Sequence, residues 1–172
     1  MMSFGDDNFS DDYLASSETS ISCIIWPQDE VGGLYLGSMK GARNVKELKT
    51  KNITAVLTVA AKSYLVYEKE DIPNHLIIEA DDEADYDLSQ HFDTALEFIG
   101  KHLETGNVFV HCFAGVSRSA TVVIAYLLKE WRKSLTEVTK YVKQKRGVAS
   151  PNRGFYKQLM EFEKKLQSER KK

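Results

Sequence analysis

The chain has 172 residues, of which 42% are hydrophobic and 28% charged, and its formal net charge is −2. These values suit a single globular domain with a tail, and they argue against a membrane-spanning protein, because no apolar run approaches the roughly 20 residues that a bilayer requires. Two cysteines, Cys23 and Cys112, are too few for a metal-binding framework or a disulfide-rich scaffold. The N-terminus also lacks the pattern of a signal peptide, so we expect a reducing, cytoplasmic or nuclear location.

Charge is distributed unevenly along the chain. No Lys or Arg precedes Lys40, whereas the sequence from Lys129 onward is strongly basic. Residues 1–20 are rich in Ser, Asp and Asn and lack periodic apolar positions, so we expect a disordered acidic tail there. Residues 21–168 then form the single domain, followed by a basic end at 169–172. The basic half is typical of solvated amphipathic helices, and a surface for phosphorylated or anionic partners is the alternative.

The first half of the domain alternates β-branched runs with one helical segment. The run Ala55–Ala60 is almost continuously apolar, which is typical of a strand covered on both faces. A Gln28-Asp29-Glu30 turn separates the two earliest strands. In chain order, the patterns predict strands at residues 21–26 and 33–36, a helix at 44–51, and strands at 55–60 and 75–80.

The second half is mainly helical. Apolar residues recur at three- and four-residue steps from Leu88 to Leu103, and Asp87 with Gln90 is expected to cap that helix. Ser134 with Glu137 forms a capping box for a further helix, and Asn152 is expected to cap the last one. The patterns predict helices at 88–103, 120–128, 134–145 and from 152 to 166, with a strand at 108–111. Strands alternating with helices indicate an α/β fold with a mostly parallel, twisted central sheet flanked by helices.

The most informative stretch is His111-Cys112-Phe113-Ala114-Gly115-Val116-Ser117-Arg118-Ser119. It places a cysteine at a strand end, a short loop after it, and an arginine where the next helix begins. A helix N-terminus, an arginine and a nest of backbone N–H groups each stabilise a thiolate. The pattern therefore predicts an anion pocket with a sulfur nucleophile, and hydrolysis of phosphate esters through a cysteinyl-phosphate.

The individual positions suit this chemistry. Gly115 lets the backbone approach a phosphate closely, and Arg118 offers two parallel donors to its oxygens. Ser119 can hydrogen-bond the sulfur and ease its departure in the second step. His111 is expected to orient the loop through its imidazole hydrogen bonds instead of acting as a base. The residues expected to surround the phosphate are Phe113, Ala114, Gly115, Val116, Ser117 and Arg118.

A structural interpretation of the same residues is the alternative. A buried cysteine at a strand end is usually a small hydrophobic residue, and an arginine after a loop is usually a surface charge. However, His, Cys, Gly, Arg and Ser would coincide at these spacings by chance at about 10⁻⁷ per position, given typical residue frequencies. We therefore favour the catalytic interpretation.

The motif resembles that of the Cys-based protein tyrosine phosphatases, and its Ala-Gly-Val-Ser-Arg-Ser-Ala-Thr form is similar to the dual-specificity branch. The resemblance covers most of Ile21 to Leu166 and includes Gly33–Ser38, Ile53–Val59 and Ala149–Phe155. It implies a protein tyrosine phosphatase-like fold and activity on phosphotyrosine together with phosphoserine or phosphothreonine. It also implies that Cys112 is the nucleophile, that Arg118 binds phosphate and stabilises the transition state, and that Ser119 assists hydrolysis of the intermediate.

A general acid is also needed, and the acidic loop at residues 81–87 offers several carboxylates. Charge alone cannot choose among them. The resemblance implies an Asp five residues before an Asn that precedes Leu-Ser, and counting back from Leu88-Ser89 selects Asp82. The chain has Asp87 at that Asn position, so Asp81 and Asp85 remain lesser candidates. The alternative for the whole run is a solvated acidic turn.

Other functions fit these residues less well than a protein phosphatase does. Phosphoinositide phosphatases of this superfamily carry basic residues inside the loop, whereas Phe113, Ala114 and Val116 are uncharged. An RNA 5′-phosphatase is less expected because the basic and aromatic residues do not interleave as in RNA-gripping surfaces. A non-catalytic phosphoprotein-binding module would lack Cys112 or Arg118. A rhodanese-like sulfurtransferase would not be expected to have the Arg-Ser ending and the acidic loop.

The expected partner is a phosphoprotein, and a mitogen-activated protein kinase is one candidate. We expect no nucleic acid partner and a monomer, and no cofactor, because the cysteine itself accepts the phosphoryl group. Cys23 is expected to pack in the first strand. The alternative is a protective disulfide with oxidised Cys112, which requires Cα atoms within roughly 7 Å.

Overall fold

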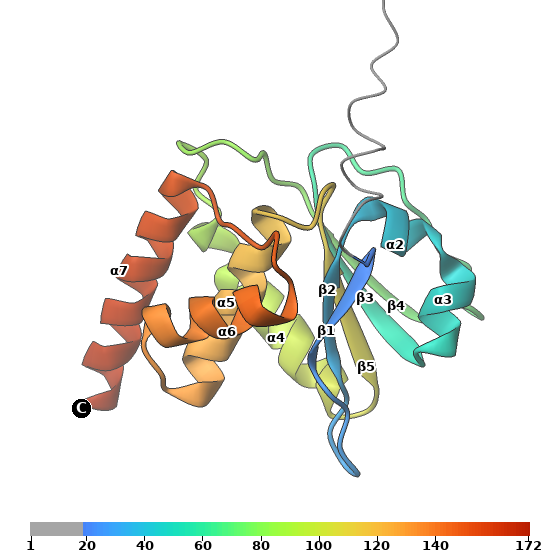
Figure 1. Cartoon of the computed structure of the whole chain (residues 1–172), viewed down its shortest axis with the longest axis horizontal. Coiled ribbons are helices and arrows are strands. Elements are labelled where there is room, and N and C mark those ends of the chain that lie inside the picture. Colours follow the sequence, from blue (N-terminus) through green and yellow to red (C-terminus); the bar gives the residue numbers. More distant parts are fainter. Residues whose placement is uncertain (1–18) are drawn as a thin grey trace, which may run out of the picture.

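A computed structural model describes residues 19–172, which form a five-stranded sheet with helices on both faces (Figure 1). The strand order is β1-β2-β5-β3-β4. β1 runs antiparallel to β2, and the other neighbouring pairs are parallel. The strands are β1 (Ile21–Ile25), β2 (Leu34–Gly37), β3 (Ile53–Val59), β4 (Asn74–Ile78) and β5 (Asn107–His111). The expected mostly parallel α/β architecture is confirmed.

β5 lies at the centre of this sheet. It pairs with β2 from Leu34↔Val108 to Gly37↔His111 and with β3 on its other side. All five of its residues are buried, as expected for a strand covered on both faces. Because the parallel strands point the same way, the loops that follow β3, β4 and β5 emerge at one edge of the sheet (Figure 1).

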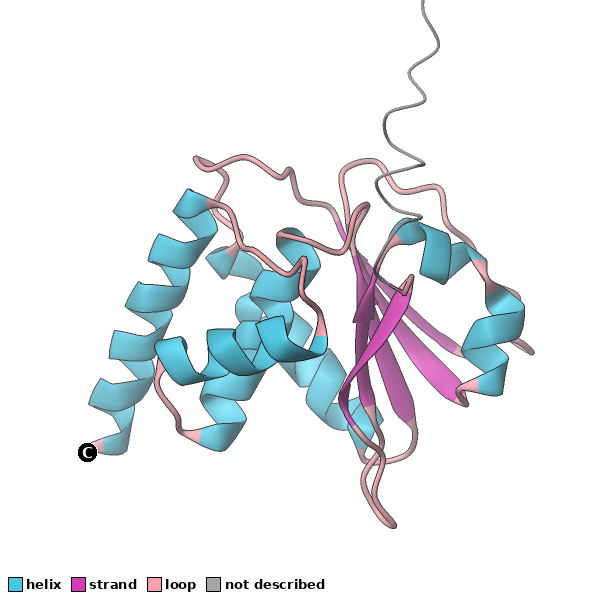
Figure 2. Cartoon of the chain, in the orientation of Figure 1, coloured by secondary structure: helices cyan, strands magenta, loops and turns pink. Residues whose placement is uncertain are grey.

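The helices divide unequally between the two faces (Figures 1 and 2). α2 and α3 cover one face, over a small core that includes Tyr35, Leu48 and Phe109. The remaining helices cover the other face, over the main core. Their bounds are α2 (Met39–Arg43), α3 (Val45–Thr50), the 3₁₀ turn η1 (Ser89–His91), α4 (Phe92–Leu103), α5 (Arg118–Trp131), α6 (Leu135–Lys145) and α7 (Arg153–Arg170).

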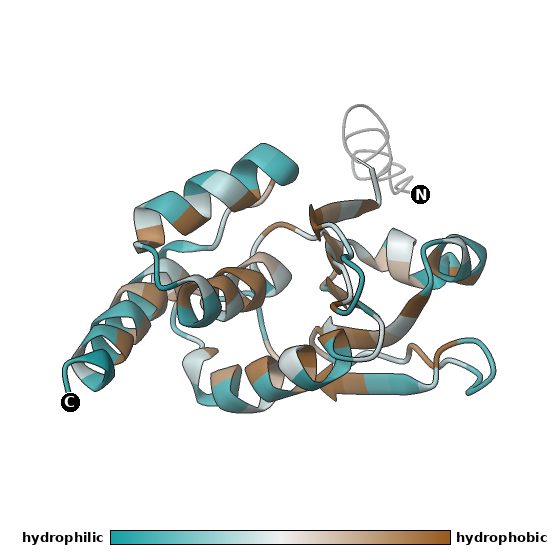
Figure 3. Cartoon of the chain, turned by 90° about the horizontal axis from the view of Figure 1, so that it is seen from below, coloured by the Kyte–Doolittle hydropathy of each residue, from teal (hydrophilic) through white to brown (hydrophobic). Residues whose placement is uncertain are grey.

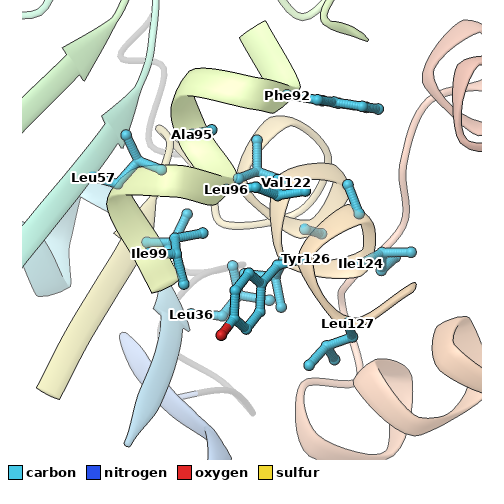
Figure 4. Close-up of a cluster of buried hydrophobic side chains, with 14 of the residues drawn as sticks. Leu36, Leu57, Phe92, Ala95, Leu96, Ile99, Val122, Ile124, Tyr126 and Leu127 are labelled. Atoms are coloured by element: carbon cyan, nitrogen blue, oxygen red, sulfur yellow. The ribbon is translucent and has the colours of Figure 1, made fainter. Parts of the chain in front are cut away.

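α5 is the central helix of the main core. Every residue from Ser119 to Leu128 is buried, and the helix contacts α4, α6 and α7 as well as the sheet. Figure 4 shows Leu96 and Ile99 of α4 and Leu36 of β2 gathered around Val122 and Tyr126 of α5. The outer helices are hydrophilic on their exposed faces (Figure 3). The helix that follows the Cys112 loop is therefore held on all sides.

Two of the three predicted helix caps are confirmed. Ser134 and Glu137 form the reciprocal capping box of α6, and the side chain of Asn152 accepts a hydrogen bond from the Phe155 N–H at 2.9 Å to start α7. The prediction for Asp87 is wrong, because its carboxylate accepts the Ser89 hydroxyl at 2.5 Å and the chain enters α4 through η1.

Most of the predicted tail, residues 1–18, lies outside the described residues. Its last two residues contact the domain, since the carbonyls of Thr19 and Ser20 accept hydrogen bonds from Arg146 and from the Ser38 N–H. Across residues 19–172, no helix has the length and apolarity that crossing a membrane would take, and no group of His, Cys, Asp and Glu is suited to a metal ion.

Candidate active site

Cys112 lies at the carboxyl end of the central strand, directly before a loop that leads into α5. Its side chain is buried, with 2% of the residue exposed. The Gly115 N–H donates to the Sγ atom at 3.2 Å, and the Ser119 Oγ lies 3.0 Å from the same sulfur. A backbone donor and a hydroxyl thus surround the thiol at the N-terminus of a helix, as the sequence predicted. Both the N–H and the hydroxyl can donate a hydrogen bond to the sulfur.

The loop is shaped by bonds on its outer side. The carbonyl of Phe113 accepts from the Met39 N–H at 2.9 Å, and that of Val116 accepts from the Ser150 N–H at 2.7 Å. The carbonyl of Ser117 accepts from Thr121 through both its N–H and its hydroxyl. In a trans peptide unit the carbonyl and the N–H point in opposite directions. Because these carbonyls point outward, the N–H groups of the same units point toward the pocket.

Gly115 is required by this geometry. Its φ of +68° lies in the left-handed region, where a side chain is strained. A Cβ atom there would also stand 2.5 Å from the Gly37 carbonyl oxygen and 2.7 Å from Nη2 of Arg146. The close packing of the loop against β2 therefore depends on the absence of a side chain.

Arg118 begins α5 and turns its guanidinium toward the acidic loop. Nη1 donates to the Ala80 carbonyl at 3.0 Å, which fixes the side chain. Within the described part of the chain, its buried Nε has no hydrogen-bond partner. Buried donors are rarely left unpaired in a folded protein. An anion bound above Cys112 would provide the missing acceptor.

His111 forms part of a buried side-chain network beneath the loop. Its Nδ1 lies 3.0 Å from the Cys112 carbonyl and must be the donor, since a carbonyl only accepts. Nε2 then accepts the Thr58 hydroxyl at 2.7 Å, and His75 Nε2 donates to Thr58 at 2.8 Å. Burial lowers the pKa of His111 to about 4, against the opposing effect of the Cys112 carbonyl. Both nitrogens of this imidazole are therefore engaged, one of them with the backbone of the Cys112 loop.

The acidic loop follows β4 and reaches the same edge of the sheet. Asp82 Oδ1 accepts a hydrogen bond from Asn152 Nδ2 at 2.9 Å, and the Asn152 N–H donates to the Ser117 hydroxyl at 2.9 Å. One asparagine therefore joins Asp82 to the Cys112 loop. Within residues 19–172, the exposed side chains of Asp81 and Asp85 form no hydrogen bond.

A groove of about 590 Å³ adjoins the site. Phe113 and Arg118 line it, together with Tyr64, which is 89% exposed. Arg43 and Lys62 also line it, and neither forms an ion pair within the described residues. No sequence pattern indicated this groove, because the loop between β3 and β4 carries no recognisable motif.

Cys23 is not close enough to Cys112 for a disulfide. It pairs with Tyr35 on β2, which pairs with Phe109 on β5. Cys23 therefore lies two strand spacings, of about 5 Å each, to the side of Phe109, and Cys112 lies three residues, of about 3.3 Å each, further along the chain. These two perpendicular displacements put the Cα atoms of Cys23 and Cys112 about 14 Å apart. This exceeds the limit of about 7 Å for a disulfide. The separation argues against a disulfide with Cys112, and the raised pKa of the Cys23 thiol, caused by burial, agrees with the packing role.

Comparison with known proteins agrees with this geometry. The family model described as the dual specificity phosphatase catalytic domain matches residues 34–165. Dual specificity protein phosphatase 1 of Arabidopsis thaliana is 41% identical over 136 residues, covering 78% of this chain and 68% of that protein. The crystal structure of human DUSP28 has a TM-score of 0.78 at 26% identity, covering 88% of this chain and 97% of that chain.

A further relative has a different domain composition. The protein named MAP kinase phosphatase with leucine-rich repeats protein 3, from Dictyostelium discoideum, is 37% identical over 140 residues, which cover 81% of this chain and 16% of that protein. The similarity is therefore confined to one part of a much larger protein.

The chain belongs to the dual specificity phosphatase family. It is a protein-tyrosine/serine/threonine phosphatase of the class that works through a cysteinyl-phosphate, as the sequence motif predicted. The resemblance of the loop to the dual-specificity branch is confirmed across the domain.

Proposed function

We propose that Cys112 is the nucleophile and Arg118 the phosphate-binding residue of this phosphatase. The observation that carries this assignment is the position of the Cys112 sulfur, between the Gly115 N–H at 3.2 Å and the Ser119 hydroxyl at 3.0 Å. The Nε of Arg118, which has no hydrogen-bond partner among residues 19–172, supplies a donor for the phosphoryl oxygens, in addition to the N–H groups of the loop.

The proposed reaction has two steps. The Cys112 thiolate attacks phosphorus, the bond to the ester oxygen breaks, and Asp82 gives its proton to the leaving oxygen. Asp82, now ionised, takes a proton from a water molecule that attacks the cysteinyl-phosphate. The sulfur–phosphorus bond breaks, the Ser119 hydroxyl stabilises the departing thiolate, and inorganic phosphate and the free enzyme result.

Asp82 is preferred as the general acid over its neighbours because a hydrogen bond fixes the position of its carboxyl group. Its hydrogen bond to Asn152 ties it to Ser117 of the Cys112 loop, whereas Asp81 and Asp85 have no such bond within residues 19–172. A proton donor must keep a defined position relative to the leaving group, so a tethered carboxyl is the better candidate.

The groove supports a phosphoprotein substrate. Its exposed aromatic rim, Phe113 and Tyr64, offers apolar contacts to residues that flank the phosphorylated one. Arg43 and Lys62 add positive charge beside the site, which favours an acidic or doubly phosphorylated segment. An activation segment of a mitogen-activated protein kinase, with phosphate on both Thr and Tyr, has this chemistry, and the name of the Dictyostelium relative agrees with it.

The test is phosphate release, in the presence of a chelator, from one peptide that carries phosphotyrosine and phosphothreonine. Wild-type protein is expected to remove both phosphates, and Cys112→Ser none, while still binding the peptide. Release of phosphotyrosine alone would contradict dual specificity at this site. Release that persists in Cys112→Ser would contradict the nucleophile assignment, and no release by wild type would favour a phosphoinositide, an RNA phosphate or a binding role.

A further inference from the structure

Arg146 is a buried arginine that contacts the Cys112 loop from behind. It follows α6, and only 2% of the residue is exposed. Its Nε donates to the Gly115 carbonyl at 2.8 Å, and its Nη2 donates to the Ala114 carbonyl at 3.3 Å. Its Nη1 binds the Thr19 carbonyl at 2.7 Å and the Ser22 hydroxyl at 3.0 Å, at the start of β1. One guanidinium thus spans the N-terminal end of the described chain and the phosphate-binding loop.

One of these two carbonyls belongs to the peptide unit whose N–H binds the sulfur. The Ala114 carbonyl and the Gly115 N–H are the two ends of one peptide unit, and in a trans peptide they point in opposite directions. Arg146 binds the carbonyl end of this unit, while its N–H end donates to Cys112 Sγ at 3.2 Å. The next peptide unit joins the Gly115 carbonyl to the Val116 N–H. Its carbonyl also accepts a hydrogen bond from Arg146, so the Val116 N–H points away from Arg146 as the Gly115 N–H does.

Arg146 differs from the other groups that hold the loop. The carbonyls of Phe113, Val116 and Ser117 are bound by neutral donors of the backbone or of Thr121. The Ala114 and Gly115 carbonyls are bound by a full positive charge. A charge at the carbonyl end of a peptide unit polarises it, so that its N–H becomes a stronger donor at the other end.

We propose that Arg146 is a positioning residue for catalysis, which fixes and polarises the peptide units of Ala114 and Gly115 so that their N–H ends stabilise the Cys112 thiolate and the phosphoryl group. It touches neither sulfur nor substrate and acts through the backbone. A lysine retains the charge but lacks the planar fork that binds both carbonyls at once. This proposal rests on the proposed role of Cys112.

The test compares Arg146→Met and Arg146→Lys with wild type in the rate at which iodoacetate alkylates Cys112, as a function of pH. Arg146→Met is expected to move the midpoint of that profile up by about one pH unit. It is also expected to lower kcat for para-nitrophenyl phosphate by about 10-fold to 100-fold, the size of a hydrogen bond to a charged group. Arg146→Lys is expected to have an alkylation midpoint and a kcat between those of wild type and Arg146→Met. KM should change less than kcat.

Two controls separate positioning from stability. Arg170→Met removes another arginine that donates to two carbonyls, those of Leu128 and Lys129, far from the site. Ser22→Ala removes a partner of Arg146 without touching the loop. Both are expected to leave the alkylation profile at its wild-type position, whatever they do to the thermal midpoint. All measurements are made well below the lowest thermal midpoint of the set.

The proposal is overturned if folded Arg146→Met has the wild-type alkylation profile and kcat, because the arginine is then only a structural bridge. If Arg146→Met does not fold, Arg146→Lys decides in the same way, and a wild-type profile overturns the proposal. Alkylation reports on the sulfur without turnover. A wild type whose Cys112 is alkylated only at alkaline pH and which releases no phosphate would instead refute the nucleophile assignment.

Discussion

The side-chain amide of Asn152 donates to the Asp82 carboxylate at 2.9 Å, although the two residues are 70 positions apart in the chain. The same asparagine caps α7 through Phe155 and binds Ser117 of the Cys112 loop through its own N–H. The position of the proposed general acid therefore depends on the start of the last helix.

Asn152→Ala is expected to reduce both activity and stability. Loss of the bond to Asp82 leaves the acid less well placed, and we expect kcat to fall by about 3-fold to 10-fold. Loss of the cap should lower the free energy of unfolding by about 1 kcal/mol. Steady-state kinetics and urea titration measure the two effects. The matched control is Asn44→Ala, which removes the cap of α3 and should reduce stability alone. Equal kcat values for the two variants would contradict the proposed link.

Asp82→Asn is expected to slow poor leaving groups most. An alkyl or serine phosphate needs a proton on the leaving oxygen, a contribution of roughly 10²-fold to 10⁴-fold, whereas para-nitrophenolate leaves with little help. The basic limb of the pH–rate profile should also flatten. The measurement is kcat/KM for a series of phosphate esters with leaving groups of graded basicity. Asp81→Asn and Asp85→Asn serve as controls, and a graded response in either of them would move the assignment.

Acid is expected to destabilise the fold through His111. Its pKa is about 4 in the folded protein and about 6.5 in an unfolded chain. Between these values the unfolded state binds more protons, so the free energy of unfolding falls as the pH falls from 6.5 toward 4. By pH 5 the loss from this group is about 2 kcal/mol. Urea titrations at pH 7.5 and pH 5 measure it. In His111→Asn, the decrease in the free energy of unfolding between pH 7.5 and pH 5 should be smaller by that amount. Equal decreases in wild type and His111→Asn would argue against the prediction.

Arg43→Gln is expected to reduce the preference for substrates with a second negative charge. Arg43 lines the groove beside Arg118 and has no ion-pair partner within residues 19–172. We expect the ratio of kcat/KM for a doubly phosphorylated peptide to that for its singly phosphorylated form to fall by about 3-fold to 10-fold, as for loss of a partly exposed charge pair. Lys40→Gln, an exposed lysine of the same helix outside the groove, is the control. A ratio unchanged in Arg43→Gln would exclude the groove from anion recognition.

The sequence predicted the fold well where the patterns were long. The apolar run of β3 covers a whole strand, and the three- and four-residue periodicity of α4 and α7 extends over several helical turns. The structure confirms all three elements. α2 was missed because it has five residues and includes Gly41, so no periodicity could develop. The error at Asp87 also concerns a short element. The residue types that start an α-helix also start a 3₁₀ turn, so the sequence did not distinguish η1 from the first turn of α4.

The site was predictable where it is contiguous. The residues from Cys112 to Ser119 follow one another, and their contacts with sulfur span at most seven positions. Arg146 binds the loop from about 30 positions away, and Thr58 reaches His111 from 53. Those contacts exist only because helices and strands pack together, and no spacing in the sequence reports them.

The central place of β5 affects how the chain can be made. β5 is the last strand in the sequence but lies between β2 and β3, so a growing chain that has not yet reached residue 107 has an empty position in its sheet. The inner edges of β2 and β3 then expose unpaired backbone groups along apolar strands, a state that invites pairing with other chains. Newly synthesised or truncated protein is therefore most prone to aggregate before β5 is inserted. The strand that presents the proposed nucleophile is also the one that completes the sheet.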